Sequence, residues 1–367
     1  MKRRPTAEPA LAFLFVVTVG LVLGLVGLVR ADDPALREPT VQTLTDGSFT
    51  SRADAVLEER HPARGPAVSL LAAVRYVVFR DASGAAVVGS DGRLFTLEEL
   101  ERHAGDEDRL GERLGEISRV VRDLRARGAE PVVVLLPAKA RLAAEKLPRR
   151  LRELADHERY ELAVDRLEEE GTVVVDLRDT LAAEHFYARD THWTPEGASV
   201  AARAVADTIA GSGVSLRADR VEYSREPLGT EPVDGDLMSF VPVGGLRDAL
   251  GLVEEAAQIY RVEPASGTGG DGGAAGSAES GDGGAAALFG ELTIPVALVG
   301  TSYSRDPRWG FEGALKHALG ADVLNVASEG IGPFEPMREY LAGDTIRDVP
   351  PEIVIWEIPE RYLTLPE

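Results

Sequence analysis

The chain has 367 residues, of which 44% are hydrophobic and 28% are charged, with 61 acidic residues against 40 basic ones and no cysteine. This composition is typical of a globular protein and excludes a wholly disordered chain, a collagen-like chain and a multi-pass membrane protein. The lack of cysteine excludes disulfides and thiolate chemistry, and the net charge of −21 argues against a general nucleic-acid binder.

The chain begins with a basic tip followed by a long apolar segment. Basic residues at positions 2–4 precede an apolar run over residues 10–29 that is 20 residues long. A bilayer core is spanned by about 20 apolar residues, whereas the apolar part of a secretory signal usually has about 7–15. We therefore expect residues 1–30 to be a cytoplasmic tip and a transmembrane signal anchor in the cell inner membrane, with the rest on the extracytoplasmic side. The alternative is a signal that is cleaved near Ala31.

Residues 31–75 are polar with scattered apolar positions and are interpreted as a stalk. Residues 77–95 contain two short β-prone runs separated by Ser-Gly and Asp-Gly turn signals. Residues 106–127 carry apolar side chains at helical spacing and predict a helix that ends near Gly128. The main domain is expected to cover residues 76–367.

Beyond residue 130, apolar runs alternate with helix-like stretches. Helices are predicted within 138–170, over 195–210 with Pro195 in the first turn, and near 309–319 and 335–342. Buried strands are predicted at 131–137, 172–177, 295–300, 321–327 and 352–358. This alternation predicts an α/β fold with a mostly parallel sheet covered on both faces. Residues 264–287 are rich in Gly, Ala and Ser and are expected to be a disordered insertion without chemistry.

The first candidate for chemistry is Ser302, in the Gly-Thr-Ser-Tyr-Ser run 300–304. The run follows a predicted strand, at the sheet edge where reactive groups collect in open α/β sheets. Gly300 and Thr301 allow a sharp turn before the serine, and the N–H groups that follow can face an oxyanion. Position 304 is not glycine, so the G-x-S-x-G pattern is not met. Taken alone, the run also fits a turn that caps the next helix.

A serine nucleophile needs a base, and His192 is the candidate among six histidines. It lies in a loop before the Pro195 helix, and Asp190 is close enough to orient its imidazole. A loop histidine that caps the helix is one alternative. A metal site of His185, Asp190 and His192 is another, although further ligands are not evident. We expect no metal and no cofactor.

Several stretches of the chain carry a family resemblance. They are VVGSDGRLF (87–95), LLPAKAR (135–141), YARDTHWTPEGA (187–198), GDL (235–237), GTSYS (300–304), NVASEGIGPF (325–334) and VIWEIPERYL (354–363). In content and order they resemble the AlgJ/AlgX-type alginate O-acetyltransferases, an SGNH-hydrolase-like family. Arg93 departs from the pattern, since the family often has Trp there, and so does the Gly-rich insertion. The chain is more similar to the membrane-anchored AlgJ-like form than to the two-domain AlgX form.

The resemblance implies an SGNH-hydrolase-like three-layer fold with Ser302 as nucleophile and with His192 and Asp190 as its catalytic partners in a D-x-H motif. It implies acyl transfer, with backbone N–H groups near the serine stabilising the oxyanion. Residues in or beside the matching motifs that could line the site are Thr301, Tyr303, Asn325, Lys139 and Arg361. The last three fit equally well as a turn residue, a solvated helix start and a C-terminal cap.

We therefore expect a cell-envelope polysaccharide O-acetyltransferase that transfers acetyl to a sugar hydroxyl of an alginate-like exopolysaccharide. A membrane-bound O-acyltransferase is the expected donor partner, because cytosolic acetyl-CoA is not available outside the cytoplasm. The alternatives are an acetyl esterase with the same triad and an inactive polysaccharide-binding or assembly module. The acidic surface would repel polyanionic alginate at long range, so a neutral or differently charged polymer fits at least as well.

Overall fold

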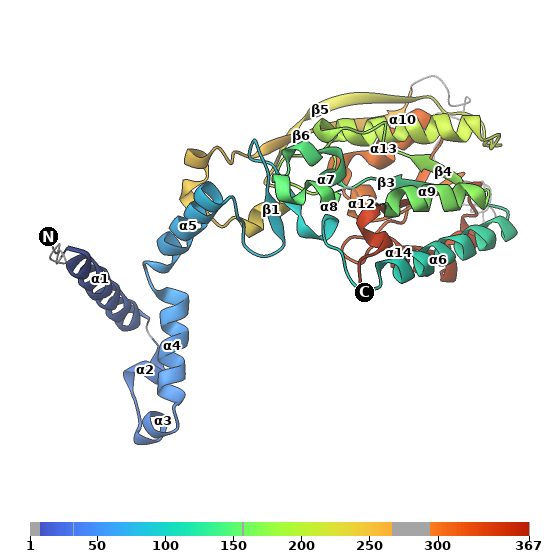
Figure 1. The fold of residues 1–367 in the computed structure, drawn as a ribbon. Coiled ribbons are helices and arrows are strands. Elements are labelled where there is room, and N and C mark those ends of the chain that lie inside the picture. The colour runs from blue at the N-terminus through green and yellow to red at the C-terminus, as the bar shows by residue number, and fades with distance from the viewer. Residues whose placement is uncertain (1–7, 32, 156–157, 266–293, 367) are drawn as a thin grey trace, which may run out of the picture. The chain divides into compact units, whose positions relative to one another are not determined.

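The computed structural model (Figure 1) describes residues 8–31, 33–155, 158–265 and 294–366. The chain divides into two compact units, one of residues 1–81 and 241–252 and the other of residues 82–240 and 253–367. The predicted insertion at 264–287 lies outside the described residues, except for Pro264 and Ala265.

The first unit is helical. Its helices are α1 (Glu8–Arg30), α2 (Pro34–Arg37), α3 (Val41–Thr45), α4 (Ser48–Arg60) and α5 (Arg64–Val74). Residues 13–30 of α1 are long and apolar enough to cross a membrane, a property that membrane anchors share with signal sequences. The end of α4 lies against α1, where the Leu57 side chain would be 3.3 Å from a Cβ at Gly24. The Nε2 atom of His61 is 3.0 Å from the carbonyl oxygen of Gly20.

The strand prediction for residues 77–79 was wrong, because these residues belong to a π-helical turn, Arg75–Phe79, that continues α5. The same helical stretch buries Ala73 and Tyr76, and α5 packs on the turn Gly244–Leu246 of its own unit. This packing outweighs the β propensity of Val77, Val78 and Phe79, since β propensity depends strongly on context.

In the second unit a short hairpin is formed by β1 (Ala86–Val88) and β2 (Leu94–Thr96). Asp91 and Gly92 have φ values of 58° and 70°, as a type I′ turn requires at its two central positions. The Asp-Gly turn signal in the sequence therefore corresponds to a real reversal of the chain.

The predicted parallel α/β sheet is confirmed. Its strands are β3 (Glu130–Leu136), β4 (Val173–Asp176), β7 (Val296–Val299), β8 (Val323–Asn325) and β9 (Ile353–Pro359), in the order β4-β3-β9-β7-β8. Every pairing in this sheet is parallel. The last strand, β9, lies at the centre, with Val354 paired to Pro131 of β3 and to Ala297 of β7.

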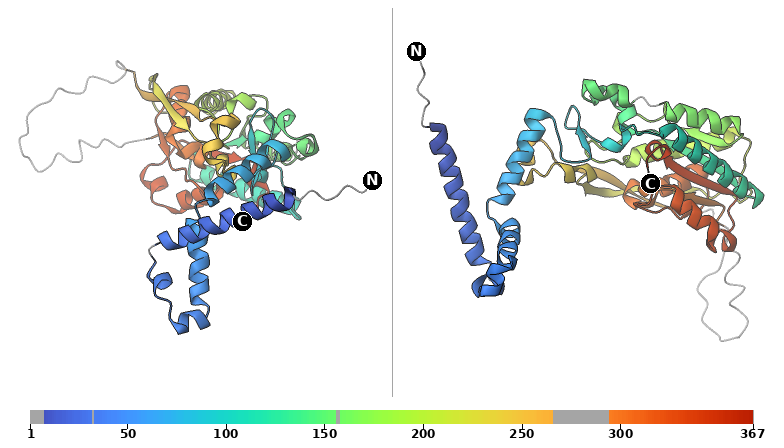
Figure 2. Two further views of the ribbon diagram at one scale, coloured as in Figure 1. Left: turned by 90° about the vertical axis from the view of Figure 1, so that its left-hand side faces the viewer. Right: turned by 60° about the horizontal axis from the view of Figure 1, so that its bottom comes forward.

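Helices cover both faces of the sheet, as Figures 1 and 2 show. Alternate residues of each strand point to opposite faces, so Val132 and Val134 enter one core and Val133 and Leu135 the other. The first core is closed by α10 (Pro195–Gly211) and α13 (Phe311–Leu319). The second is closed by α6 (Asp106–Ala126), α9 (Arg159–Glu169) and α14 (Phe334–Ala342). The other α-helices in the described part of this unit are α7 (Lys139–Leu142), α8 (Arg152–Ala155), α12 (Ser302–Arg305) and α15 (Thr345–Asp348).

Two features were not predicted. The helix-like stretch 138–170 is broken into short pieces, with Pro148 extended at ψ 134° between two of them. A long antiparallel hairpin, β5 (Tyr223–Val233) and β6 (Glu255–Pro264), buries Val233 and Ala257 in the core on the α10 side. The site described next lies at the carboxyl ends of β3, β7 and β9.

Candidate active site

Ser302 lies in a tight turn between β7 and α12. Thr301 is the N-cap of α12 and has an extended backbone, and Ser302 is the first residue of that helix. The Thr301 hydroxyl accepts a 3.4 Å hydrogen bond from the N–H of Tyr303, which fixes the turn. The first N–H groups of a helix have no partner within it, so the turn presents donors beside the Ser302 hydroxyl.

Gly300 is required by the close approach of a neighbouring carboxylate. A Cβ at this position would lie 2.5 Å from Oε2 of Glu357 and 2.9 Å from Oγ of Ser304. Glu357 is in the central strand β9 and is fully buried. The turn can therefore approach β9 only if residue 300 has no side chain.

The loop that carries His192 is a narrow reversal of the chain held against the serine turn. Phe186 and Trp193 form an isolated antiparallel bridge across it. The Trp193 Nε1–H donates to the carbonyl of Tyr303 over 3.2 Å, and the Tyr303 hydroxyl donates to the carbonyl of Thr191 over 2.6 Å. These reciprocal bonds bring two segments that are distant in sequence into contact.

Ser302, His192 and Asp190 form a hydrogen-bonded line. His192 Nε2 is 2.8 Å from Ser302 Oγ, and His192 Nδ1 is 2.6 Å from Asp190 Oδ1. An ionised carboxylate only accepts hydrogen bonds, so Nδ1 carries the proton and Nε2 is left to accept from the serine hydroxyl. The arrangement can remove a proton from Ser302 and stabilise the resulting imidazolium.

Asp190 is kept ionised by its hydrogen bonds. Burial alone would raise the pKa of this carboxyl, but bonds from the ring and the backbone N–H of His192 outweigh burial and hold the pKa below its usual range. The backbone N–H of Asp236 donates to the other oxygen of Asp190 over 3.0 Å. Asp236 in turn accepts from the N–H of Thr191 at 2.8 Å and from its hydroxyl at 2.5 Å.

The imidazole is also held by aromatic rings. Trp309 stacks on it, with ring centroids 5.0 Å apart and planes 20° apart, and Tyr303 lies at 4.7 Å. The His192 side chain keeps 13% of its surface exposed. Ring packing and the bond to Asp190 thus leave the imidazole little freedom, and Nε2 is directed at the Ser302 hydroxyl.

Lys139 and Asn325, which were candidates to line the site, have their polar atoms engaged by the protein. The buried Lys139 Nζ donates to the carbonyls of Leu94, Ala188 and Asp190 over 2.6 to 3.1 Å. Asn325 Nδ2 donates to the carbonyl of Ser304 over 2.8 Å, and its Oδ1 accepts from the N–H of Ala327. These hydrogen bonds favour a role for Lys139 and Asn325 in positioning the loops of the site.

The other candidates surround the serine turn. The N–H of Thr301 donates to Glu357 Oε2 over 2.8 Å, so it is not available to an oxyanion. Tyr303 is buried, and burial raises the pKa of its hydroxyl. The guanidinium of Arg361 lies 5.9 Å from the Tyr303 ring centroid, and its Nε is 3.3 Å from a carboxylate oxygen of Glu98.

Two residues that support the site were not among the sequence candidates. Glu357 accepts hydrogen bonds from Thr301 and from the Ser304 hydroxyl, the latter at 3.0 Å. Burial raises the pKa of Glu357. Asp236 orients the Asp190 loop, as described above. Both lie inside stretches quoted for the family resemblance, GDL and VIWEIPERYL, and those stretches were the only signal available.

Asp190, His192 and Asp236 together offer three ligand atoms within 4.8 Å of one another. The carboxylate oxygens of Asp190 accept from His192 and from the N–H of Asp236, and those of Asp236 accept from Thr191. These carboxylate oxygens already accept hydrogen bonds from the protein, so the three residues fit a hydrogen-bond relay better than a cation site. His185, the other histidine considered, has Nδ1 2.9 Å from the N–H of Ala182.

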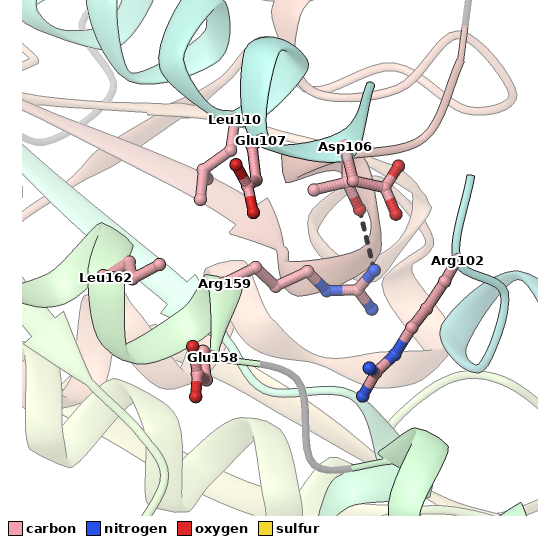
Figure 3. A pocket seen from close by; sticks show the side chains of 8 residues that line it. Arg102, Asp106, Glu107, Leu110, Glu158, Arg159 and Leu162 are labelled. Carbon is pink, nitrogen blue, oxygen red and sulfur yellow. Dashed lines mark hydrogen bonds between the residues drawn. The ribbon is translucent and has the colours of Figure 1, made fainter. Parts of the chain in front are cut away.

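A separate hollow lies between α6 and the start of α9 (Figure 3). Arg159 runs along it, and its guanidinium donates to Glu360, Thr364 and the carbonyl of Glu99. Glu360 also accepts from the N–H of Ala138 over 2.9 Å. Glu360 thus joins the segment after β9 to the segment after β3, and Arg159 holds Glu360 in place. The lining of the hollow includes none of the predicted site residues.

Comparisons with known proteins identify the family of the chain. The sequence matches the profile of a family described as SGNH hydrolase-like domain, acetyltransferase AlgX, over residues 86–360. It is 32% identical over 354 residues to the probable alginate O-acetylase AlgJ of Pseudomonas putida, covering 95% of this chain and 88% of that protein. Its identity to the AlgJ of Pseudomonas aeruginosa is 34% over 352 residues, with coverages of 94% and 88%.

The fold of this chain is similar to those of solved structures from the same family. The O-acetyltransferase domain of Pseudomonas putida AlgJ has a TM-score of 0.65 at 33% identity and covers 77% of this chain and 93% of that one. Pseudomonas aeruginosa AlgX has a TM-score of 0.56 at 23% identity, covers 78% of this chain and 63% of that one, and shares the fold. The resemblance drawn from the sequence motifs is confirmed.

Proposed function

This chain belongs to the AlgJ/AlgX family of SGNH hydrolase-like acetyltransferases, and we propose that it is a cell-envelope polysaccharide O-acetyltransferase that carries the acetyl group on Ser302. The observation that carries the proposal is the line of hydrogen bonds from Asp190 through His192 to Ser302. Nucleophile, base and orienting carboxylate in this geometry are what acyl transfer through an acyl-enzyme requires.

In the first half-reaction, His192 Nε2 takes the proton of Ser302 while Oγ attacks the acetyl carbonyl carbon of the donor. The carbonyl oxygen becomes an oxyanion. Because the N–H of Thr301 is bound to Glu357 and that of Tyr303 to the Thr301 hydroxyl, the N–H group of Ser302 is the proposed donor to it. The bond from the acetyl carbon to the leaving atom then breaks, and the leaving atom takes the proton from His192.

In the second half-reaction, a sugar hydroxyl gives its proton to His192 Nε2 and attacks the acetyl carbon. The bond to Ser302 Oγ breaks, and Oγ regains a proton from His192. Asp190 stays ionised throughout and stabilises each imidazolium, consistent with its lowered pKa. Water in place of the sugar would give hydrolysis, so access to the acyl-enzyme decides between the two outcomes.

The acceptor we propose is an exopolysaccharide, and relatives named for alginate O-acetylation point to alginate itself. The net charge of −21 works against a polyanion at long range. A neutral polymer is therefore a necessary second acceptor in any assay. The apolar helix α1 suits an anchored enzyme whose acetyl groups come from a membrane-bound O-acyltransferase on the extracytoplasmic side.

The test of acyl-enzyme chemistry is acetyl release from 4-nitrophenyl acetate by the wild type and by Ser302→Ala. Ser224→Ala, on β5 and outside the site, is the matched control. We expect Ser302→Ala to lose nearly all activity above background and Ser224→Ala to retain it. Equal activity of the wild type and Ser302→Ala would refute the role of Ser302, and a wild type without activity would favour a binding or assembly module.

Transfer is separated from hydrolysis by adding an oligosaccharide acceptor, in one arm a uronate oligomer and in the other a neutral one. Mass spectrometry then detects acetylated product. Acetylated sugar that forms with wild type and not with Ser302→Ala supports the transferase. Acetate alone in both arms would assign the protein as an esterase.

A further inference from the structure

One stretch of the acidic chain has no acidic residue. Residues 60–80 contain four arginines, at positions 60, 64, 75 and 80, and neither Asp nor Glu, although the whole chain has a net charge of −21. Between Arg64 and Arg75 the side chains are uncharged. The stretch forms α5 and the π-helical turn that follows it. It is therefore an apolar helix with arginines towards both ends, bordered by Glu59 before the stretch and Asp81 after it, and nothing in the proposed chemistry uses it.

Only one side of this helix is buried in its own unit. Ala73 and Tyr76 are 8% and 5% exposed. A Cβ at Gly244 would lie 2.5 Å from the Ser69 hydroxyl, so the turn at Gly244–Leu246 packs closely on this side. The inward-facing residues follow a spacing of three to four, as expected for one face of a helix.

The opposite side is apolar and exposed. Its large side chains are 40% to 69% exposed and are Leu70, Leu71, Val74, Val77, Val78 and Phe79; we call this set the α5 face. Soluble proteins rarely leave a contiguous apolar patch of this kind in water, and such patches mark interaction surfaces or membrane contact. The apolar stretch is too short to span a bilayer, since a span takes about 20 apolar residues.

The structure also supplies a reason to identify the partner as lipid. The α5 face belongs to the same unit as α1, whose residues 13–30 could cross a membrane. His61, three residues before α5, has Nε2 3.0 Å from the carbonyl of Gly20 in the middle of that apolar helix. Arg60 Nη1 also donates to the carbonyl of Ala31, just after α1, over 2.7 Å, so the stretch begins beside the end of α1, where a membrane-spanning helix would leave the lipid.

We propose that the α5 face is a membrane-docking surface that lies in the boundary between headgroups and acyl chains of an anionic bilayer. The apolar side chains enter the acyl region, and Arg64 and Arg80, towards the two ends of the stretch, meet anionic phosphates. Arg60 and Arg75 bond to the Ala31 carbonyl and to Asp81, respectively. An apolar face with basic residues at its edges is what interfacial helices use for this purpose. The inference does not depend on the chemistry at Ser302.

The experiment uses the full chain, which has no cysteine, so a single introduced thiol can carry an environment-sensitive fluorophore. The reporter is Leu71→Cys on the α5 face, and the control is Leu228→Cys on β5, which is 56% exposed against 62% for Leu71. Each labelled protein is reconstituted into vesicles of phosphatidylethanolamine and phosphatidylglycerol, with ordinary or brominated acyl chains. Circular dichroism verifies that both variants are folded.

We expect the probe at position 71 to emit at shorter wavelength in vesicles than in detergent-free buffer and to lose most of its emission in brominated vesicles. The probe at position 228 should show neither change. Equal behaviour of the two probes would overturn the proposal. A shift at position 71 that needs an added membrane-protein fraction and shows no bromine quenching would also overturn it, and would assign the face to a protein partner.

The basic ends of the stretch are tested with Arg64→Glu and Arg80→Glu in the Leu71→Cys background. Quenching should weaken in phosphatidylglycerol vesicles for the double variant, and it should weaken for the parent when phosphatidylglycerol is replaced by phosphatidylcholine. Quenching that is unchanged in both comparisons would contradict the assignment of an anionic surface.

Discussion

Replacing Gly300 by alanine tests whether the serine turn depends on its close approach to Glu357. The new Cβ would lie 2.5 Å from Glu357 Oε2, 3.0 Å from Glu357 Cβ and 2.9 Å from Ser304 Oγ. These contacts are about 0.5–1 Å inside the usual separation of nonbonded heavy atoms. Because Glu357 is fully buried in the central strand, the turn has to move. Overpacking of this kind costs about 1–3 kcal/mol, and a shift of about 1 Å at a reacting group lowers the rate by about 10²-fold.

The matched control is Gly115→Ala on helix α6, where a Cβ meets nothing within 4 Å. Alanine is favoured over glycine inside a helix, so this variant should be more stable by about 0.5–1 kcal/mol. Chemical denaturation gives the free energy of unfolding of each variant, and 4-nitrophenyl acetate gives kcat/KM. If Gly300→Ala retains wild-type stability and activity, the turn is not held by steric fit to Glu357 and the reasoning fails.

The remaining predictions concern charged groups around the serine. Glu357→Gln keeps the shape of the side chain but replaces charge-assisted hydrogen bonds by weaker ones, so kcat should fall by about tenfold with little change in KM. Steady-state kinetics measure both constants, and an unaltered kcat would show that Glu357 does not support the serine turn. Asp190→Asn should lower kcat by on the order of 10³- to 10⁴-fold, because an amide N–H opposite His192 Nδ1 stabilises the wrong tautomer of the imidazole. A loss of only a few-fold in the same assay would contradict the proposed role of Asp190. Burial, aided by the charge of Arg93, lowers the pKa of Lys139 to about 7, while an unfolded lysine titrates at about 10.4. Between these values the unfolded chain binds the proton and the folded chain does not, so the free energy of unfolding contributed by this group should rise with pH from about 7 to 10; Lys139→Met should remove that rise in denaturation curves, and an identical pH profile for both proteins would disprove it.

The sheet could be predicted from the sequence because its strands are short, fully buried apolar runs. The run at 131–137 corresponds to β3 and the run at 352–358 to β9. Burial on both faces leaves little room for polar residues, so the pattern is strong locally. The order of the strands in the sheet, in contrast, could not be predicted from the sequence. No local signal indicates that β9 lies between β3 and β7, because that choice depends on how the crossover connections pack.

The β5–β6 hairpin and residues 77–79 show where local patterns fail. β5 contains two prolines and a glycine and is largely exposed, so neither composition nor alternation indicates a strand. It is formed by pairing with β6, more than twenty residues further along the chain. Val77, Val78 and Phe79 have strong β propensity but continue a helix whose other face is packed.

At the site, the residues nearest the expected chemistry could be proposed because their spacing is local. Asp190 and His192 are two residues apart, and Ser302 follows a strand. Glu357 and Asp236 could not be proposed from the residues themselves, since their effect is exerted across 56 and 45 residues of chain, respectively, through hydrogen bonds to Thr301 and Thr191. The catalytic roles of all these residues stay predictions until the variants are measured.

The central place of β9 has a consequence for biogenesis. The pairs β4-β3 and β7-β8 are joined to each other only through β9, which is the last of the five to be synthesised. A nascent chain therefore holds two incomplete half-sheets with open apolar edges, which are templates for misassembly. The strand that closes the gap also carries Glu357, so the turn around Ser302 gains its hydrogen bonds to Glu357 in the same event that covers the open edges. The contacts around the serine turn are therefore complete only when the open edges of both half-sheets are covered.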